Sequence, residues 1–432
     1  MAGGRVYSSV SQWTVYLREN DMDSGGCRFC GRVLQHVFID LGMSPMANSY
    51  LKSYQLSQME PFYPLRAHVC DQCFLVQLDQ FESPDQIFSD YAYFSSYSEM
   101  FLRHAKTYVD MVVDRFKLGT QSYVVEIASN DGYLLKNFVA RGIPVMGIEP
   151  AKNVAEVAIK NGVATLVKFF GSQTAQELVG HGRQPDLIIG NNVLAHVPDL
   201  NDFVQGLKIL LGPRSVVTME FPHLMRLMAD NQFDTIYHEH FSYFSLSTVE
   251  KVFARHGLAV FDVEEISTHG GSLRIYACHR EDQSKAPSAR LADLKRREEE
   301  HGFLRIETYL SFSEGVAETK RALLSFLIEA KRSRKSVVAY GAAAKASTLL
   351  NYCGVRTDFV DYIVDRSPHK QGHFIPGVHI PIHDPEHIRL TRPDYVLIMP
   401  WNLRDEIMQQ MAFVRDWGGK FVLPIPAVRV YP

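Results

Sequence analysis

The sequence predicts an α/β protein with three parts: a metal-binding N-terminal module followed by two doubly wound domains, each built on a parallel sheet. Two Cys-x-x-Cys pairs lie near the N-terminus, apolar runs of four or five residues alternate with helical patterns in the middle of the chain, and a second alternation begins near residue 336. A chain of 432 residues is long enough for about three domains. The expected boundaries are residues 1–85, 86–288 and 289–432.

Four cysteines define the N-terminal module: Cys27, Cys30, Cys70 and Cys73. Four thiolates complete a tetrahedron around Zn²⁺ and leave no position for a catalytic water, so the predicted zinc is structural. Residues 31–69 separate the two pairs, and we expect a small subdomain to fold between them. Disulfides are the alternative. They are disfavoured because the sequence shows no secretory signal and cytosolic thiols stay reduced.

Charge and hydropathy limit the classes of partner. Lys and Arg number 45 and Asp and Glu number 48, which gives a net charge of −3 and no basic stripe. Nucleic acid is therefore a disfavoured partner. No apolar run approaches the roughly 20 residues that cross a bilayer. We expect a cytoplasmic protein that acts on a small molecule, while the oligomeric state stays open.

The expected elements follow in chain order. The first module is predicted to be irregular, and a helix is predicted over residues 99–116. Apolar runs followed by loops and helical patterns are typical of buried parallel strands. Two further runs flank Gly270-Gly271, a pattern that favours an antiparallel hairpin. The predicted strands are residues 123–127, 144–148, 186–189 and 215–219, and the hairpin pairs 260–265 with 272–277.

A charged helical stretch over residues 289–335 is expected to connect the two doubly wound domains. The second alternation of strands and helices follows it. Its predicted strands are residues 336–340, 360–365, 395–399 and 420–423.

The loop after the first central strand is the predicted cofactor site, because ligands bind beyond the carboxyl ends of strands at the switch point of an open sheet. The loop contains one glycine and lacks the G-x-G-x-x-G cradle for a pyrophosphate, so an adenosyl ligand without phosphates fits better. An acid at the end of the next strand can accept both hydroxyls of a ribose. The predicted cofactor-binding residues are Glu126, Ala128, Asn130, Asp131, Gly132, Glu149, Asn191 and Asn192.

The run Tyr237-His238-Glu239-His240 is the densest group of acid–base side chains in the chain, and His196 is expected to converge on it. A second metal site is disfavoured, because residues two apart do not share a helix face and the HExxH spacing is absent. Structural histidines are an alternative. A general base is favoured, because histidine titrates near neutral pH. Such a cluster can remove a proton beside a ketone and stabilise the enolate.

In this order, the motifs resemble the S-adenosylmethionine-dependent C-methyltransferases of deoxysugar antibiotic pathways, which act on dTDP-linked keto-sugars. The resemblance covers nearly the whole chain. It implies a zinc-bearing N-terminal domain, a class I methyltransferase domain with a Rossmann-like fold, and a second Rossmann-like domain that holds the nucleotide-sugar. The implied cofactors are S-adenosylmethionine and structural Zn²⁺.

The same resemblance implies roles for individual side chains. His240 matches the base that takes the proton from the carbon to be methylated, with Tyr237 and Glu239 beside it. His196 matches a proton relay or a substrate contact, and Tyr91 matches an active-site tyrosine from the N-terminal side.

The segment Gly341 to Lys345 opens a helix after a strand, where backbone N–H groups favour an anion. Its spacing is not that of a P-loop, so nucleotide hydrolysis is not implied. Gly341, Lys345 and Lys370 are the predicted diphosphate contacts, with solvated surface lysines as the alternative. Three other functions remain open at this stage: a keto-sugar epimerase or isomerase, a related small-molecule C-methyltransferase, and a zinc-containing nucleotide-sugar-binding protein.

Overall fold

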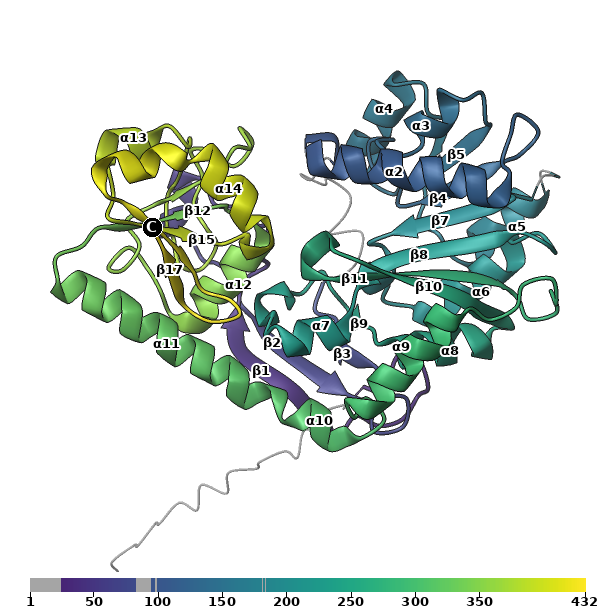
Figure 1. Ribbon diagram of the computed structural model, residues 1–432, viewed down its shortest axis with the longest axis horizontal. Coiled ribbons are helices and arrows are strands. Elements are labelled where there is room, and N and C mark those ends of the chain that lie inside the picture. The colour runs from purple at the N-terminus through teal and green to yellow at the C-terminus, as the bar shows by residue number, and fades with distance from the viewer. Residues whose placement is uncertain (1–24, 83–94, 98, 181, 183) are drawn as a thin grey trace, which may run out of the picture.

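The computed structural model describes residues 25–82, 95–97, 99–180, 182 and 184–432. Tyr91, a predicted active-site residue, lies outside the described residues. Figure 1 shows a central α/β lobe beside a C-terminal α/β lobe, with the N-terminal strands below them and α11 (Phe312–Arg332) running from one lobe toward the other.

The N-terminal module is a sheet, so the prediction of an irregular module is wrong. β1 (His36–Ser44), β2 (Tyr63–Val69) and β3 (Val76–Leu78) pair antiparallel, and the fourth strand is β9 (Ser242–Tyr243) from the central domain. Irregular register interrupts the pairing of β1 with β2 at two places. Each shift breaks the period-two alternation by which a strand is found in a sequence.

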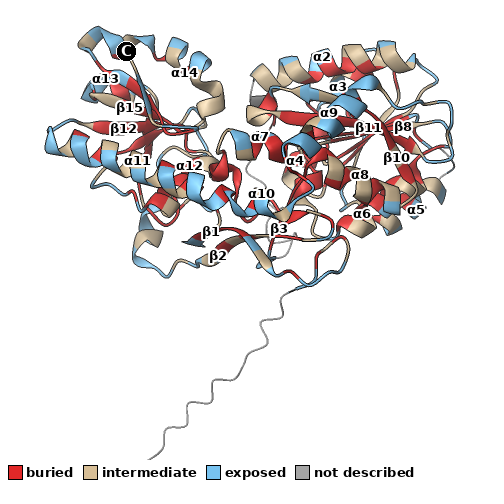
Figure 2. Ribbon diagram, turned by 60° about the horizontal axis from the view of Figure 1, so that its bottom comes forward, coloured by how far each residue is buried: buried red, intermediate tan, exposed pale blue. Residues whose placement is uncertain are grey.

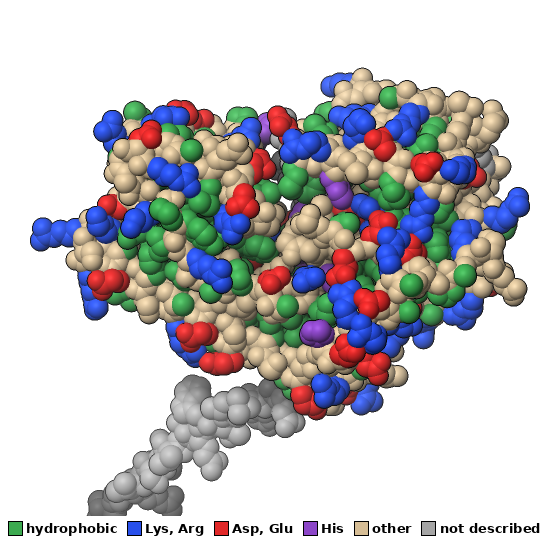
Figure 3. Space-filling view, in the orientation of Figure 1, with side chains coloured by type: hydrophobic (Ala, Val, Ile, Leu, Met, Phe, Trp, Pro, Cys, Tyr) green, Lys and Arg blue, Asp and Glu red, His purple; other side chains and the backbone are tan. Residues whose placement is uncertain are grey.

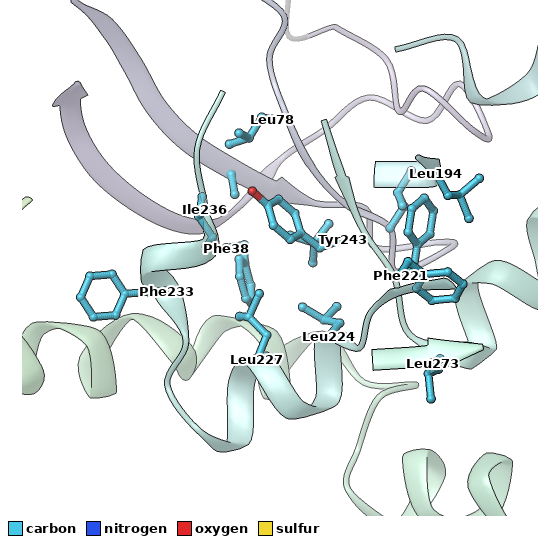
Figure 4. Packing of buried hydrophobic residues seen from close by; sticks show 14 of the residues in the cluster. Phe38, Leu78, Leu194, Phe221, Leu224, Leu227, Phe233, Ile236, Tyr243 and Leu273 are labelled. Carbon is cyan, nitrogen blue, oxygen red and sulfur yellow. The ribbon is translucent and has the colours of Figure 1, made fainter. Parts of the chain in front are cut away.

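This small sheet shares one core with the rest of the molecule. Phe38 on β1 stacks on Phe312 of α11 with ring centroids 4.8 Å apart. Figure 4 shows Phe38 near Leu227 of α7 (Leu224–Ala229), within the same cluster as Tyr243. The N-terminal module is therefore fixed to the central domain by apolar packing as well as by strand pairing.

The central sheet confirms the four predicted strands and the hairpin. Its seven strands have the order β10-β11-β8-β7-β4-β5-β6, with β4 to β8 parallel and β10 and β11 antiparallel. The strands are β4 (Val124–Ile127), β5 (Val145–Ile148), β6 (Thr165–Leu166), β7 (Leu187–Asn191), β8 (Val216–Pro222), β10 (Leu258–Ile266) and β11 (Ser272–His279).

Helices account for the burial of these strands, which appears as red in Figure 2. The predicted helix over residues 99–116 is confirmed as α2 (Glu99–Phe116). Besides α7, the other helices of this lobe are α3 (Lys136–Val139), α4 (Lys152–Lys160), α5 (Ser172–Gly180), α6 (Leu200–Leu210) and α8 (Leu246–Arg255).

The charged stretch after residue 289 is helical as predicted, but it forms three helices: α9 (Ala289–Glu300), α10 (Ile306–Leu310) and α11. Gly302, with φ +81°, follows α9 and provides the turn away from it. The buried carboxylate of Glu298 binds α9 to the central lobe, since its Oε1 lies 2.8 Å from Nε2 of His223.

The C-terminal sheet has the order β14-β13-β12-β15-β16-β17 and is parallel except for β17. The second alternation is thus confirmed. The strands are β12 (Val337–Tyr340), β13 (Ile363–Val364), β14 (Ile382–His383), β15 (Tyr395–Ile398), β16 (Lys420–Leu423) and β17 (Arg429–Tyr431), and the helices are α12 (Ala344–Cys353), α13 (His387–Thr391) and α14 (Arg404–Gln410).

Both sheets have a switch point at which the order of strands reverses. It lies at β4 in the central sheet, between β5 and β7, and at β12 in the C-terminal sheet, between β13 and β15. The loops that follow these strands are the edges where ligands bind in open α/β sheets. Among the helices of the described residues, none has the length and apolar character needed to cross a membrane.

Candidate active site

The backbone at the central switch point is strained. Ala128, Asn130 and Asn192 have φ of 55°, 51° and 55°, a backbone conformation that residues other than glycine rarely adopt. Gly132 has φ +77°, and a Cβ there would lie 2.9 Å from Cγ2 of Val163. Strained residues cluster at functional sites, where the surrounding structure holds them in place. The predicted cofactor residues are therefore in a conformation that needs support.

Glu149 provides part of that support. Its Oε2 accepts a hydrogen bond from the backbone N of Asn130 and its Oε1 accepts one from the backbone N of Ala151, both at 2.9 Å. Each oxygen retains a second lone pair. Glu149 thus shapes the loop through these two hydrogen bonds. Its contact with ribose hydroxyls stays a prediction.

The same edge is acidic and rich in acceptors. Among the described residues, Oε2 of Glu126, Oδ1 of Asp131 and the side-chain oxygens of Asn191 and Asn192 are inaccessible to solvent and have no hydrogen-bond partner. Burial, followed by the charges of Glu149 and Asp131, raises the pKa of Glu126 well above its ordinary value. A ligand with positive charge and hydrogen-bond donors suits this edge, and an adenosyl sulfonium has both.

His240 is held in one tautomer. Its Nδ1 lies 2.9 Å from the carbonyl oxygen of Thr235, which can only accept, so Nδ1 carries the hydrogen and Nε2 carries the lone pair in the neutral ring. The ring centroid lies 4.0 Å from that of Tyr237 and 4.7 Å from that of His196. The structure thus brings three of the predicted catalytic residues together.

Burial keeps these histidines neutral. It is the main cause that lowers the pKa of His240 well below its ordinary value, and the charge of His196 adds to the effect. Burial also lowers the pKa of His196 to about 4. Both rings are therefore unprotonated near neutral pH, the state that a general base requires.

Glu239 faces the N-terminal module. Its Oε1 accepts a hydrogen bond of 2.7 Å from Nδ2 of Asn48, and burial raises the pKa of Glu239 to about 7. The sequence analysis missed Asn48. No short motif marks it, because its partner lies 191 residues later in the chain.

A second missed residue is His269, which lies in the turn Thr268–Gly270 between β10 and β11. Its backbone has φ 55° and ψ 17°, and its Nε2 has no hydrogen-bond partner among the described residues. Burial, followed by the charge of Lys345, lowers the pKa of His269 to about 4. A histidine directly before Gly270-Gly271 was the available signal, but the two glycines were used only to predict the hairpin.

Hydrogen bonds from neighbouring residues hold the loop after β12, at the switch point of the C-terminal sheet. The backbone N of Ala342 donates to Oδ2 of Asp365 at 2.8 Å, and its carbonyl oxygen accepts from the hydroxyl of Tyr50 at 2.6 Å and from Nζ of Lys370 at 2.8 Å. Gly341 has φ +95°, and a Cβ there would lie 2.4 Å from Cγ of Pro400. Lys370, predicted to bind a diphosphate, lies here against the loop.

Lys345 approaches the central domain. Its Nζ lies 4.2 Å from the ring centroid of Trp401 and donates to Oδ1 of Asn402 at 3.0 Å. Nε1 of Trp401 in turn donates to Oδ2 of Asp234 at 2.8 Å. In Figure 3, histidine side chains are visible at the hollow between the two lobes. Lys345, the predicted diphosphate contact, thus lies close enough to Asp234, His240 and His269 for its charge to act on them.

The four cysteines fit a zinc ion. Sγ of Cys27 lies 3.5 Å from that of Cys73, Sγ of Cys30 lies 3.5 Å from that of Cys70, and all four sulfurs lie within 4.8 Å of one another. Zn–S bonds of about 2.3 Å in a tetrahedron place the sulfurs about 3.8 Å apart. No pair is close enough for a disulfide. Gln77 donates to Sγ of Cys27 from 3.2 Å and orients that thiolate.

Three family models match the chain in the expected order. They describe a zinc binding domain over residues 27–88, a methyltransferase domain over residues 101–263 and a C-methyltransferase C-terminal domain over residues 267–426. The C-methyltransferase NovU of Streptomyces niveus is 34% identical to this chain over 404 residues, which cover 94% of this chain and 96% of NovU.

Solved structures of methyltransferases are similar to less than half of this chain. Magnesium protoporphyrin IX methyltransferase (ChlM) from Synechocystis PCC 6803 with bound SAM shares 17% identity and a TM-score of 0.31, covering 42% of this chain and 82% of that one. The PH0226 protein from Pyrococcus horikoshii OT3 shares 16% identity and a TM-score of 0.35, covering 46% of this chain and 99% of that one.

Proposed function

Since this chain belongs to the S-adenosylmethionine-dependent C-methyltransferase family, we propose that it methylates a carbon beside the ketone of a nucleotide-linked deoxysugar, with His240 as the base. The observation that carries the proposal is the hydrogen bond from Nδ1 of His240 to the Thr235 carbonyl oxygen, which leaves Nε2 to accept a proton. The family membership favours methyl transfer over the epimerase and binding-protein alternatives.

His240 can act as a base because its ring is neutral before the reaction and a hydrogen bond stabilises the protonated ring that forms. When Nε2 takes the proton, the Thr235 carbonyl oxygen stabilises the imidazolium through Nδ1–H. Burial, which lowers the pKa of His240, also makes the protonated ring costly. Proton transfer is therefore favourable only if the site stabilises the enolate strongly.

Tyr237 and His196 restrict the His240 ring from two sides and orient its lone pair. Glu239, held by Asn48, and Tyr91, which lies outside the described residues, complete the proposed catalytic group. Positioning of the substrate in a closed site supplies much of the rate enhancement in such a mechanism.

The central switch-point edge is the proposed cofactor site. When bound there, S-adenosylmethionine supplies a methyl group on a positively charged sulfur. The acids Glu126, Asp131 and Glu149 lie at this edge, where a bound cation favours the ionised form of Glu126 against the burial that raises its pKa, and the side chains of Asn191 and Asn192 offer acceptors to the ligand.

The nucleotide-sugar is proposed to enter from the side of the C-terminal domain. Gly341 and Lys345 lie at the start of α12, and Lys370 packs against them through its hydrogen bond to the Ala342 carbonyl oxygen and its ion pair with Asp365 at 3.6 Å. A small-molecule substrate matches the proposed reaction, and nucleic acid is not a proposed partner.

The test replaces His240 with Asn. We expect methyl transfer to a dTDP-keto-deoxysugar to fall by about 10² to 10⁴, while the affinity for S-adenosylmethionine stays unchanged. His256→Asn is the matched control, because His256 follows α8 and binds Asn201 away from the site. Unchanged turnover in His240→Asn would remove His240 as the base. Wild-type protein that forms no S-adenosylhomocysteine with any keto-sugar would contradict the substrate class.

A further inference from the structure

One cationic side chain of the C-terminal domain reaches the acid–base cluster of the central domain. We propose that Lys345 is a catalytic residue whose ammonium group binds the ketone oxygen of the substrate and stabilises the enolate. The proposal deepens the proposed function and rests on it. It differs from the predicted role of Lys345 at the diphosphate, because it places the positive charge at the reacting end of the substrate.

The geometry fixes the ammonium group in place. Lys345 lies in the first turn of α12, with Nζ over the ring of Trp401 at 4.2 Å and bonded to Asn402 at 3.0 Å. A lysine ammonium has three N–H groups, and Asn402 accepts one of them. Among the described residues, Asn402 is the hydrogen-bond acceptor of Nζ and the Trp401 ring covers one side of it, so the ammonium group retains a donor for a ligand.

Trp401 fits closely against the central domain and carries Lys345 with it. Its Nε1 donates to Asp234 at 2.8 Å. A Cβ at Gly270 would lie 2.3 Å from Cη2 of Trp401, so only a glycine allows this approach. Gly270 directly follows His269 in the chain, and Asp234 directly precedes Thr235, the partner of His240. The contacts of Trp401 thus place Lys345 beside the two segments that carry His269 and the partner of His240.

Burial lowers the pKa of Lys345, and the charge of Asp234 opposes that shift and favours the ammonium form. The Lys345 ammonium lies near enough to Asp234, His240 and His269 to change the pKa of all three groups. A cation beside His240 makes protonation of that ring less favourable, and this is a free-energy cost of proton transfer to His240. The cost is offset when negative charge develops nearer to Lys345 than to His240, as it does on the oxygen of an enolate.

Nε2 of His240 takes the proton from the carbon beside the ketone, and the C–H electron pair forms the C=C bond of the enolate. The carbonyl π pair moves to oxygen, where Lys345 binds the resulting negative charge. The enolate carbon then forms a bond to the methyl carbon as the oxygen lone pair restores C=O, and the electrons of the S–C bond stay with sulfur.

The test measures enolate formation apart from methyl transfer. A dTDP-keto-deoxysugar is incubated in D₂O with the protein and S-adenosylhomocysteine, and deuterium at the carbon beside the ketone is followed by mass spectrometry. The variants are Lys345→Met and Lys345→Arg. Lys320→Met is the matched control, because Nζ of Lys320 also lies over an aromatic ring, that of Tyr352 at 4.5 Å. The affinity for dTDP is measured in parallel by calorimetry.

We expect Lys345→Met to lower the exchange rate at saturating substrate by about 100- to 1,000-fold, with dTDP affinity changed less than threefold and Lys320→Met equal to wild type. Lys345→Arg retains the charge and should therefore keep a larger share of the exchange rate. Exchange by this variant would also show that a substitution at this position does not unfold the protein. The proposal is overturned if Lys345→Met exchanges at the wild-type rate. A tenfold loss of dTDP affinity with unchanged exchange would assign Lys345 to the diphosphate. Wild-type protein that exchanges no deuterium would contradict the proposed function itself.

Discussion

The two parallel sheets have the same hydrogen-bonded arrangement at their switch points. In the central sheet, Glu149 at the end of the second strand accepts from the backbone N of Asn130 in the loop after the first strand, at 2.9 Å. In the C-terminal sheet, Asp365 accepts in the same way from the backbone N of Ala342, at 2.8 Å. Each acid uses its other oxygen for an N–H two residues further along the chain, at 2.9 and 2.8 Å.

The two edges differ in what faces these loops. In the central sheet, the side-chain oxygens of Glu126 and Asn192 remain without a partner among the described residues. In the C-terminal sheet, Pro400 lies against Gly341 and Trp401 contacts the central domain. One topology therefore leaves unpartnered acceptors at the edge of the first sheet and gives a contact with the other domain at the edge of the second, and the side chains that follow β7 and β15 contribute to this difference.

The largest expected effect comes from loss of the zinc site, because structural zinc contributes on the order of 10 kcal/mol to folding in small domains. The N-terminal module contacts Glu239 through Asn48 and the Ala342 loop through Tyr50, and neither contact involves the cofactor edge. We expect Cys27→Ser to lose zinc and to weaken nucleotide-sugar affinity at least tenfold, with S-adenosylmethionine affinity changed less than threefold. Elemental analysis and calorimetry give these values.

Cys278→Ser is the control for Cys27→Ser, since Cys278 is buried in β11 and is not part of the zinc cluster. It should retain zinc and both affinities. If Cys27→Ser loses zinc and keeps its nucleotide-sugar affinity, the N-terminal module does not support the C-terminal edge.

The next effect concerns Glu239, which binds Asn48 of the N-terminal module. Burial raises the pKa of Glu239 to about 7 from an ordinary value of 4.5, so the folded state binds a proton that the unfolded state has released in this window. Stability should fall as pH rises from 4.5 to 7, to a full cost of about 3 kcal/mol above pH 7. Glu239→Gln keeps an acceptor for Asn48 and should be the more stable protein at pH 8.

Thermal midpoints measured from pH 4.5 to 8 test this expectation. The difference between Glu239→Gln and wild type should grow with pH and level off above 7. A constant difference over that range would show that Glu239 stays ionised in the folded protein, in a wetter site than its burial implies.

The sequence predicted best what depends on neighbours in the chain. The central strands are short apolar runs because both faces are buried, and the cysteine pairs and the His240 run are contiguous motifs. The N-terminal sheet was missed because bulges disturb β1 and because its last strand, β9, follows β3 by more than 160 residues.

The missed site residues share one physical reason. Asn48 bonds a residue 191 positions away, and Asp234 bonds Trp401 across 167 positions. His269 gains its importance from a strained backbone and from the approach of Lys345. Each role arises from contact between elements that only the tertiary structure brings together, so no local spacing could indicate it.

A paired substitution tests the comparison of the two acids directly. Glu149→Gln should lower S-adenosylmethionine affinity by about 10- to 100-fold, because hydrogen bonds to a charged acceptor contribute about 1.5–3 kcal/mol and hold the strained loop. Asp365→Asn, the equivalent change in the C-terminal sheet, should leave that affinity unchanged. Calorimetry measures the S-adenosylmethionine affinity of both variants. Equal losses of this affinity would mean that the two edges act as one binding unit.

The smallest expected effect belongs to Tyr50→Phe, which removes one hydrogen bond to the Ala342 carbonyl oxygen while Lys370 keeps another. Since that oxygen retains a partner, the loss of stability should be about 1 kcal/mol, the net contribution of an ordinary hydrogen bond. Methyl transfer should show a raised KM for the nucleotide-sugar and an unchanged KM for S-adenosylmethionine. Tyr54→Phe is the control, because Tyr54 is exposed on the same module. If both KM values rise together in Tyr50→Phe, the C-terminal loop supports the cofactor edge as well, and the division of labour between the two sheets is less complete than their contacts indicate.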